Sequence, residues 1–285
     1  IFCLMLAAAS AQDVPSPLTS AFLAIEKQDY QRALDLAKQD GAVASDIVEW
    51  HLHRAKAGTA EGAINFLARN PDWPGLPYLK KRSEGSFLAA PIDVIGQFFG
   101  MNPPQTAQGG LAYAAALNAA QNKKLARKIV RKAWEFYKMP ALVQDVYVSS
   151  YGKDIKNLTP KRLYEMLWRQ EDEQAKALYP LLNSSDKAFA RTRLALMDGK
   201  SGVDALLSRV SSKQRSHPLL SHARFKWRLS KGKRKSAIQL ILATSESKDA
   251  LGKPEVWGND RRNIARDLVR DKSYQKAYQL AANHF

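Results

Sequence analysis

The stretch "FLARNPDWPGLPYLKKR" (Phe66–Arg82) joins two amphipathic segments through a short corner that holds three prolines, a glycine and a tryptophan. Pro71 cannot continue the first helix, and the Pro-Gly pair at 74–75 supplies turn chemistry. Pro77 falls early enough to be tolerated in the first turn of the next helix. The stretch therefore predicts two helices joined at a rigid corner, with Trp73 packed over the end of the hairpin.

Most of the remaining chain follows the same scheme of short helices and tight breaks. Apolar residues recur with helical periodicity over segments of about 10–14 residues, and no alternating strand pattern is present. The spacing Tyr–x–x–Ala–x–x–x–Ala over 30–37 returns over 274–281, and small residues at these positions let paired helices pack closely. We therefore predict an all-α fold: an α-superhelix or solenoid of stacked helical hairpins, with degenerate TPR-like repeats, over residues 12–285.

The first residues, "IFCLMLAAASAQD" (1–13), form an apolar run that ends in small residues. This pattern is typical of a secretory signal peptide, here residues 1–11, cleaved after Ala11. It lacks an initiator methionine and a basic n-region, so we expect a signal that is truncated at its N-terminus. A short buried helix is the alternative. A membrane span is not expected, because a span needs about 20 apolar residues.

Cysteine usage limits the chemistry of the exported chain. The only cysteine, Cys3, lies in the expected signal peptide. The mature chain would therefore contain no disulfide, no thiol nucleophile and no cysteine-type zinc site. We expect a periplasmic, cysteine-free protein.

The chain is strongly basic. It has 285 residues with 44 Lys and Arg against 27 Asp and Glu, a formal net charge of +17. Such a charge favours polyanionic partners: nucleic acid, an acidic membrane surface or a carboxylate-bearing cell wall. We expect no nucleic acid, because no nucleic-acid-binding motif is recognisable and the predicted export argues against it.

Two segments concentrate this charge. "KKLARKIVRK" (123–132) and "KWRLSKGKRK" (226–235) each carry six cations and no acid, whereas "RRNIARDLVR" (261–270) is interrupted by an aspartate. On a helix, the cations of the first segment share the face opposite its apolar residues. A solvated helix face is the alternative interpretation. The residues that we predict to face a polyanion such as peptidoglycan are Lys124, Lys128, Arg131, Lys132, Lys231, Lys233 and Arg234.

Candidates for catalysis and metal binding are weak. His51 and His53 are two residues apart and point to different sides of a helix, and the other histidines lack ligand spacing. Glu246 lies in a polar segment without the apolar surroundings that raise the pKa of a general acid. We therefore predict no metal site, no cofactor and no catalytic residue in this chain.

Six segments occur in an order that resembles one family, the soluble lytic murein transglycosylases, in their N-terminal region. They are "DIVEW" (46–50), "FLARNPDWPGLPYLKKRSE" (66–84), "VRKAW" (130–134), "LTPKRLYEMLW" (158–168), "ARFKWRLSKGK" (223–233) and "ALGKPEVWGNDRRNIARDLVRDKSYQKAYQLAANH" (250–284). The resemblance covers nearly the whole mature chain.

The resemblance implies the superhelical region of a periplasmic enzyme that cleaves MurNAc–GlcNAc bonds of peptidoglycan to 1,6-anhydro-muramoyl products. In the family this region curls into a ring and supports a lysozyme-like catalytic domain. The partners it implies are peptidoglycan glycan strands and that C-terminal domain.

This sequence departs from the family pattern in its chemistry. Glu246-Ser247 matches the family's catalytic Glu-Ser pair, but the "GLMQ"-type and "AYNAG"-type motifs that should follow are missing. We therefore expect the catalytic domain to be absent from this chain. The alternative is a non-catalytic periplasmic helical-repeat scaffold that binds protein partners.

Overall fold

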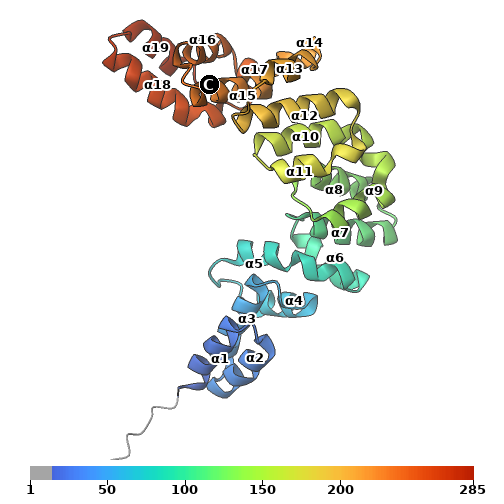
Figure 1. The fold of residues 1–285 in the computed structure, drawn as a ribbon. Helices are drawn as coiled ribbons and strands as arrows, with labels where there is room; N and C mark the ends of the chain where they lie inside the picture. Colours follow the sequence, from blue (N-terminus) through green and yellow to red (C-terminus); the bar gives the residue numbers. More distant parts are fainter. Residues whose placement is uncertain (1–14) are drawn as a thin grey trace, which may run out of the picture. The chain divides into compact units, whose positions relative to one another are not determined.

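The computed structural model describes residues 15–285, and this part of the chain is built of helices joined by turns, without a strand (Figure 1). The predicted fold class is thereby confirmed, whereas the predicted signal peptide lies outside the described residues. The α-helices are α1 (Pro17–Glu26), α2 (Tyr30–Ala37), α3 (Ala42–Arg54), α4 (Ala60–Arg69), α5 (Leu76–Ser83), α6 (Ile92–Met101), α7 (Ala107–Ala119), α8 (Lys123–Phe136), α9 (Ala141–Ile155), α10 (Thr159–Trp168), α11 (Asp172–Ala177), α12 (Ser184–Met197), α13 (Val203–Ser208), α14 (Ser212–Arg215), α15 (Pro218–Ser230), α16 (Arg234–Thr244), α17 (Lys248–Leu251), α18 (Gly258–Arg270) and α19 (Tyr274–Ala282).

The domain that we expected over 12–285 comprises two compact units. One runs to residue 133 and includes 142–147; the other contains 134–141 and 148–285. Within each unit, helices pack chiefly on their neighbours in the sequence, such as α1 on α2, α6 on α7, α15 on α16 and α18 on α19. This nearest-neighbour packing is the organisation of an α-solenoid.

One turn geometry joins seven pairs of successive helices and is the repeat that the sequence only partly displays. The second residue after the first helix takes a left-handed conformation, with φ between 54° and 68°. The next residue donates its N–H to the carbonyl five positions back, which satisfies the helix end by a Schellman bond. The left-handed residues are Gln28, Lys56, Gln121, Gln170, Gly199, Gly232 and Lys272.

A second repeated device closes the carboxyl end of a helix with an arginine from a later helix. Three arginines donate to a backbone carbonyl in the last turn of a helix, 26 or 28 residues earlier in the chain. The carbonyls at a helix end have no partner in their own helix and carry the negative end of its dipole, so a guanidinium is a favourable donor. The pairs are Arg82 to Arg54, Arg162 to Trp134, and Arg193 to Leu167.

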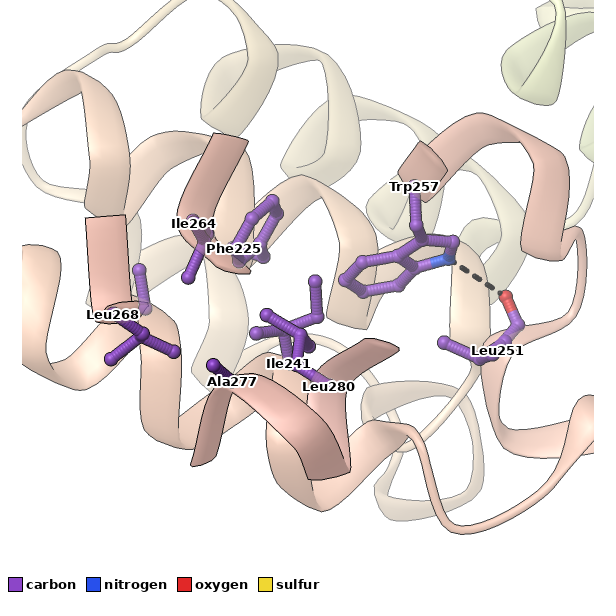
Figure 2. Close-up of a cluster of buried hydrophobic side chains, with 9 residues drawn as sticks. Phe225, Ile241, Leu251, Trp257, Ile264, Leu268, Ala277 and Leu280 are labelled. Atoms are coloured by element: carbon purple, nitrogen blue, oxygen red, sulfur yellow. Dashed lines mark hydrogen bonds between the residues drawn. The ribbon is translucent and has the colours of Figure 1, made fainter. Parts of the chain in front are cut away.

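The core of the second unit combines buried apolar side chains with one buried hydrogen bond (Figure 2). Phe225, Ile241, Ile264 and Leu280 are all at most 2% exposed and pack between α15, α16, α18 and α19. Trp257 is fully buried beside them and donates its indole N–H to the carbonyl of Leu251 at 3.1 Å. Aromatic burial and one satisfied polar group thus fix this end of the unit.

The corner that joins α4 to α5 has the predicted form. Asn70 caps α4, Gly75 takes φ +73° before α5, and Pro77 lies in the first turn of α5. Trp73 packs edge-on against the buried Phe66, with ring centroids 5.8 Å apart. The interpretation of Trp73 as packing is therefore confirmed.

The sequence pattern favours a helix start at Ser45 and loose connections at 84–90 and 151–157, and the structure differs at all three places. Helix α3 begins earlier, at Ala42, and the Ser45 hydroxyl donates to the carbonyl of Gly41. Residues 84–90 largely form the 3-10 helix η2 (Glu84–Ala89). Residues 151–155 continue α9 with only a kink at Tyr151.

Candidate functional site

The first predicted basic surface lies on α8. Ala126, Val130, Ala133 and Trp134 are buried at no more than 1% exposure, so this side of the helix is fixed against the fold. The apolar and charged sides of the 123–132 segment separate as its helical periodicity requires. The cations are therefore held on the outside.

Lys124, Lys128 and Lys132 form a row on the exposed side of α8, which we call the lysine row. They are four residues apart, so each is displaced by about 6 Å along the helix from the one before. Within residues 15–285 none of the three forms an ion pair with a carboxylate. Arg131 is exposed beside the row. The charges of the three lysines are available to a partner in solution.

The second predicted group surrounds the turn between α15 and α16. Lys231 and Lys233 flank Gly232 and are exposed, and the ammonium of Lys233 lies 4.9 Å from the ring centre of Trp227. Arg234 forms an ion pair with Asp267 at 2.5 Å, so part of its charge is already compensated. This group belongs to the second unit, whereas the lysine row belongs to the first.

The first turns of α8 and α16 contain no acidic residue. Lys123 and Lys124 begin α8, and Arg234 and Lys235 begin α16. Because a helix N-terminus already carries a partial positive charge, cations there raise the local positive potential. Both basic surfaces are thus electrostatically suited to an anionic partner.

A third group, which sequence analysis missed, lies where α3 packs on α5. The guanidinium carbon of Arg54 is 4.1 Å from the ring centre of Trp50 and 4.8 Å from that of Tyr78. Arg82 lies 5.8 Å from the Tyr78 ring and donates its Nε–H to the carbonyl of Arg54 at 2.7 Å. We call Trp50, Arg54, Tyr78 and Arg82 the arginine–aromatic cluster. An aromatic residue followed four positions later by arginine, on both helices, is the sequence signal that could have revealed it.

The corner at 70–77 supports this cluster. The indole N–H of Trp50 donates to the carbonyl of Pro74 at 2.9 Å. A Cβ at Gly75 would lie 3.1 Å from a terminal nitrogen of Arg54, so glycine serves both the positive φ and the close approach of the guanidinium. The corner therefore holds one side of the cluster as well as joining two helices.

Glu84 is the other polar residue that sequence analysis missed. It is 1% exposed and accepts hydrogen bonds from the backbone N–H of Gln105 and from the N–H and hydroxyl of Thr106, at 2.6–2.7 Å. Burial raises its pKa against the effect of these bonds. A raised carboxyl pKa is common in catalytic acids, but here three donors tie the carboxylate to the loop before α7. Its role is to anchor that loop.

Four of the five histidines, all except His284, pack against aromatic rings. Burial lowers the pKa of His53 and of His222 to about 4, so both are neutral at pH 7. His222 packs edge-on against Trp257, with ring centroids 4.8 Å apart. His51 touches Phe22 and Trp50 instead of pairing with His53. In residues 15–285 no three His, Cys, Asp or Glu side chains are grouped to hold a metal ion.

Glu246 is exposed just after α16, as its polar surroundings predicted.

No helix in the described part of the chain combines the length and the apolar character needed to cross a membrane.

Comparison of the chain with protein-family models, curated proteins and solved structures gave no match.

Proposed function

We propose that this chain is the superhelical region of a periplasmic lytic transglycosylase and that it holds peptidoglycan strands for a catalytic domain outside this sequence. The observation that carries the binding role is the lysine row of α8, whose three exposed ammonium groups form no ion pair with any residue of 15–285. Cell-wall peptidoglycan carries many carboxylates, so such a surface attracts it over a distance limited by salt screening.

The "GKPEVW" residues, part of the 250–284 segment that resembles this enzyme family, have specific places in the fold. A Cβ at Gly252 (φ +71°) would lie 2.7 Å from Pro218 and 3.0 Å from Trp168. Lys253 forms an ion pair with Glu165 at 2.8 Å, and Trp257 is buried. The segment therefore contacts α10 and α15 and leads into α18, so its residues have a structural role in the fold.

Sedimentation with purified peptidoglycan tests the binding role. Reversing three charges in the variant Lys124→Glu, Lys128→Glu, Lys132→Glu should reduce the fraction that pellets at low salt at least severalfold. The matched control reverses Lys38, Lys176 and Lys200, which are exposed and already paired with acids. Both variants change the net charge equally, so equal pelleting would overturn the proposal.

A second candidate function is a periplasmic scaffold for protein partners. It is favoured by large apolar side chains left exposed in the first unit, with Met101 at 79% and Leu142 at 80%. Helical-repeat proteins use such surfaces to hold partners. Capture of defined partners that is lost in Met101→Ser and Leu142→Ser, together with no pelleting on peptidoglycan, would favour this function over glycan binding.

A further inference from the structure

We propose that the arginine–aromatic cluster of α3 and α5 is a binding site for a carboxylate attached to a sugar ring. The choice of a sugar as the carrier rests on the proposed function. The anion-binding part stands on the geometry of Trp50, Arg54, Tyr78 and Arg82 alone.

The first argument is the fixed orientation of Arg54. Its guanidinium lies 4.1 Å from the Trp50 ring centre and 4.8 Å from the Tyr78 ring centre, and Trp50 is in turn bonded to the backbone of Pro74. Aromatic rings on two elements hold the planar group while leaving its N–H donors at the edge of the plane. A held guanidinium loses little conformational entropy when it binds a ligand.

The second argument is that these donors are unused. In the described residues 15–285, Arg54 donates no hydrogen bond from its side chain and forms no ion pair. Arg82 uses only its Nε–H, on the carbonyl of Arg54, which leaves its terminal nitrogens without an acceptor there. By contrast, Arg69 on α4 is saturated by Asp46 at 2.7 Å and Glu49 at 2.8 Å.

The third argument is electrostatic. The bond from Arg82 to the Arg54 backbone brings two guanidinium groups together around one tyrosine ring, and no carboxylate of residues 15–285 pairs with either. Like charges this close repel, and an anion that accepts from both relieves the repulsion. Paired arginine forks match the planar, two-oxygen geometry of a carboxylate.

The fourth argument concerns what carries the carboxylate. Tyr78 is 47% exposed beside the two guanidinium groups, so a ring attached to the anion would lie against an aromatic surface. Trp50 is half-buried on the other side of Arg54. A pyranose ring that bears an acidic substituent supplies both parts: an apolar ring face for the aromatic residue and a carboxylate for the arginines.

Heteronuclear NMR of the full chain tests the site with small probes. N-acetylmuramic acid, which has the carboxylate, should shift the Trp50 indole and Arg54 Nε–H resonances in a saturable manner. N-acetylglucosamine, which lacks the carboxylate, should not shift them at the same concentration. Arg54→Lys keeps the charge but loses the planar fork, and should weaken binding about tenfold. Arg69→Lys is the matched control and should leave binding unchanged.

A second variant guards against loss of the fold. Tyr78→Ser changes an exposed ring and should weaken N-acetylmuramic acid binding more than it weakens inorganic phosphate binding, because the sugar loses its aromatic contact while Trp50 still holds Arg54. If phosphate alone binds as tightly as N-acetylmuramic acid, the sugar part of the proposal is wrong. If no probe shifts these resonances while the chain still pellets with peptidoglycan, the site is wrong and the proposed function stands. If the probe binds but the chain does not pellet with peptidoglycan, the anion site stands and the proposed function is wrong.

Discussion

Arg162 on α10 lies over the ring of Trp134, with its guanidinium carbon 5.0 Å from the ring centre, and donates to the carbonyl oxygen of the same residue. It also donates to the carbonyl of Tyr137 at 2.8 Å and to the side chain of Gln174 at 3.3 Å. Arg162 is fully buried. One side chain therefore closes the end of α8 and joins it to α10 and α11.

Replacement of this arginine should be costly. We expect Arg162→Met to lower the free energy of unfolding by about 2–4 kcal/mol, because one buried and one part-buried carbonyl lose their donor. Arg162→Lys should lose less stability than Arg162→Met but should not match the unmodified chain, since one ammonium cannot reach all three acceptors. Urea denaturation of the two variants measures both effects.

Arg169 provides the control for that prediction. It donates to the carbonyl of Phe136 at 2.6 Å, but its side chain is 40% exposed. We expect Arg169→Met to cost less than about 1 kcal/mol, because water replaces the lost donor. Equal losses at the two positions would show that burial of the guanidinium is not what matters.

The repeated turn predicts that substitutions to and from glycine at its left-handed position change stability in opposite directions. Gln121 has φ 58° and Gly232 has φ 68° at the same position of equivalent turns. Only glycine takes this conformation without steric cost, so Gln121→Gly should stabilise the chain by about 0.5–1 kcal/mol and Gly232→Gln should destabilise it by a similar amount. Thermal unfolding of both variants checks the signs, and a loss of stability in Gln121→Gly would contradict the assignment of the turn.

The two buried histidines predict acid sensitivity. In the folded chain His53 and His222 have a pKa of about 4, against 6.5 for an ordinary histidine. Their contribution is therefore fully present above pH 6.5 and is lost as the pH falls from 6.5 to 4, by up to about 3 kcal/mol for each. Urea midpoints across this range measure the loss. His222→Phe should flatten the curve relative to the unmodified chain, and an unchanged slope would exclude His222 as the cause.

Peptidoglycan binding should depend on salt if the lysine row carries it. Raising the salt from about 0.05 M to about 0.5 M shortens the screening length severalfold and should release most of the pelleted chain. The variant that reverses Lys124, Lys128 and Lys132 should show a flatter dependence. Salt-resistant pelleting of the unmodified chain would instead indicate that apolar contacts dominate.

The helices were largely predictable because their signals are local. The corner after α4 follows from Pro71 and Gly75, and the exposure of Lys124 and Lys128 follows from the apolar residues that share their helix. The cap of α3 was not predictable in this way. Ser45 has the right residue type, but the helix begins earlier, where Gly41 supplies the required backbone.

The candidate sites also differ in whether they depend on one helix or on packing between helices. The lysine row depends on one helix and was predicted from its sequence, whereas the arginine–aromatic cluster needs α3 to pack on α5. Glu84 gave no sign of burial in its own segment, because its hydrogen-bond donors lie 21 and 22 residues further on. Pairings between helices cannot be read from a pattern that spans one helix.

The sequence by itself determined that the chain is helical, where its hairpins turn and which face of α8 carries the charge. These properties depend on periodicity, turn chemistry and composition within a few residues. Only the tertiary structure decided which basic residues became structural. Arg162 and Arg193 are buried donors to helix ends, whereas Lys128 is exposed. The physical reason is that burial of a guanidinium depends on acceptors 26 to 28 residues away, which local sequence does not encode.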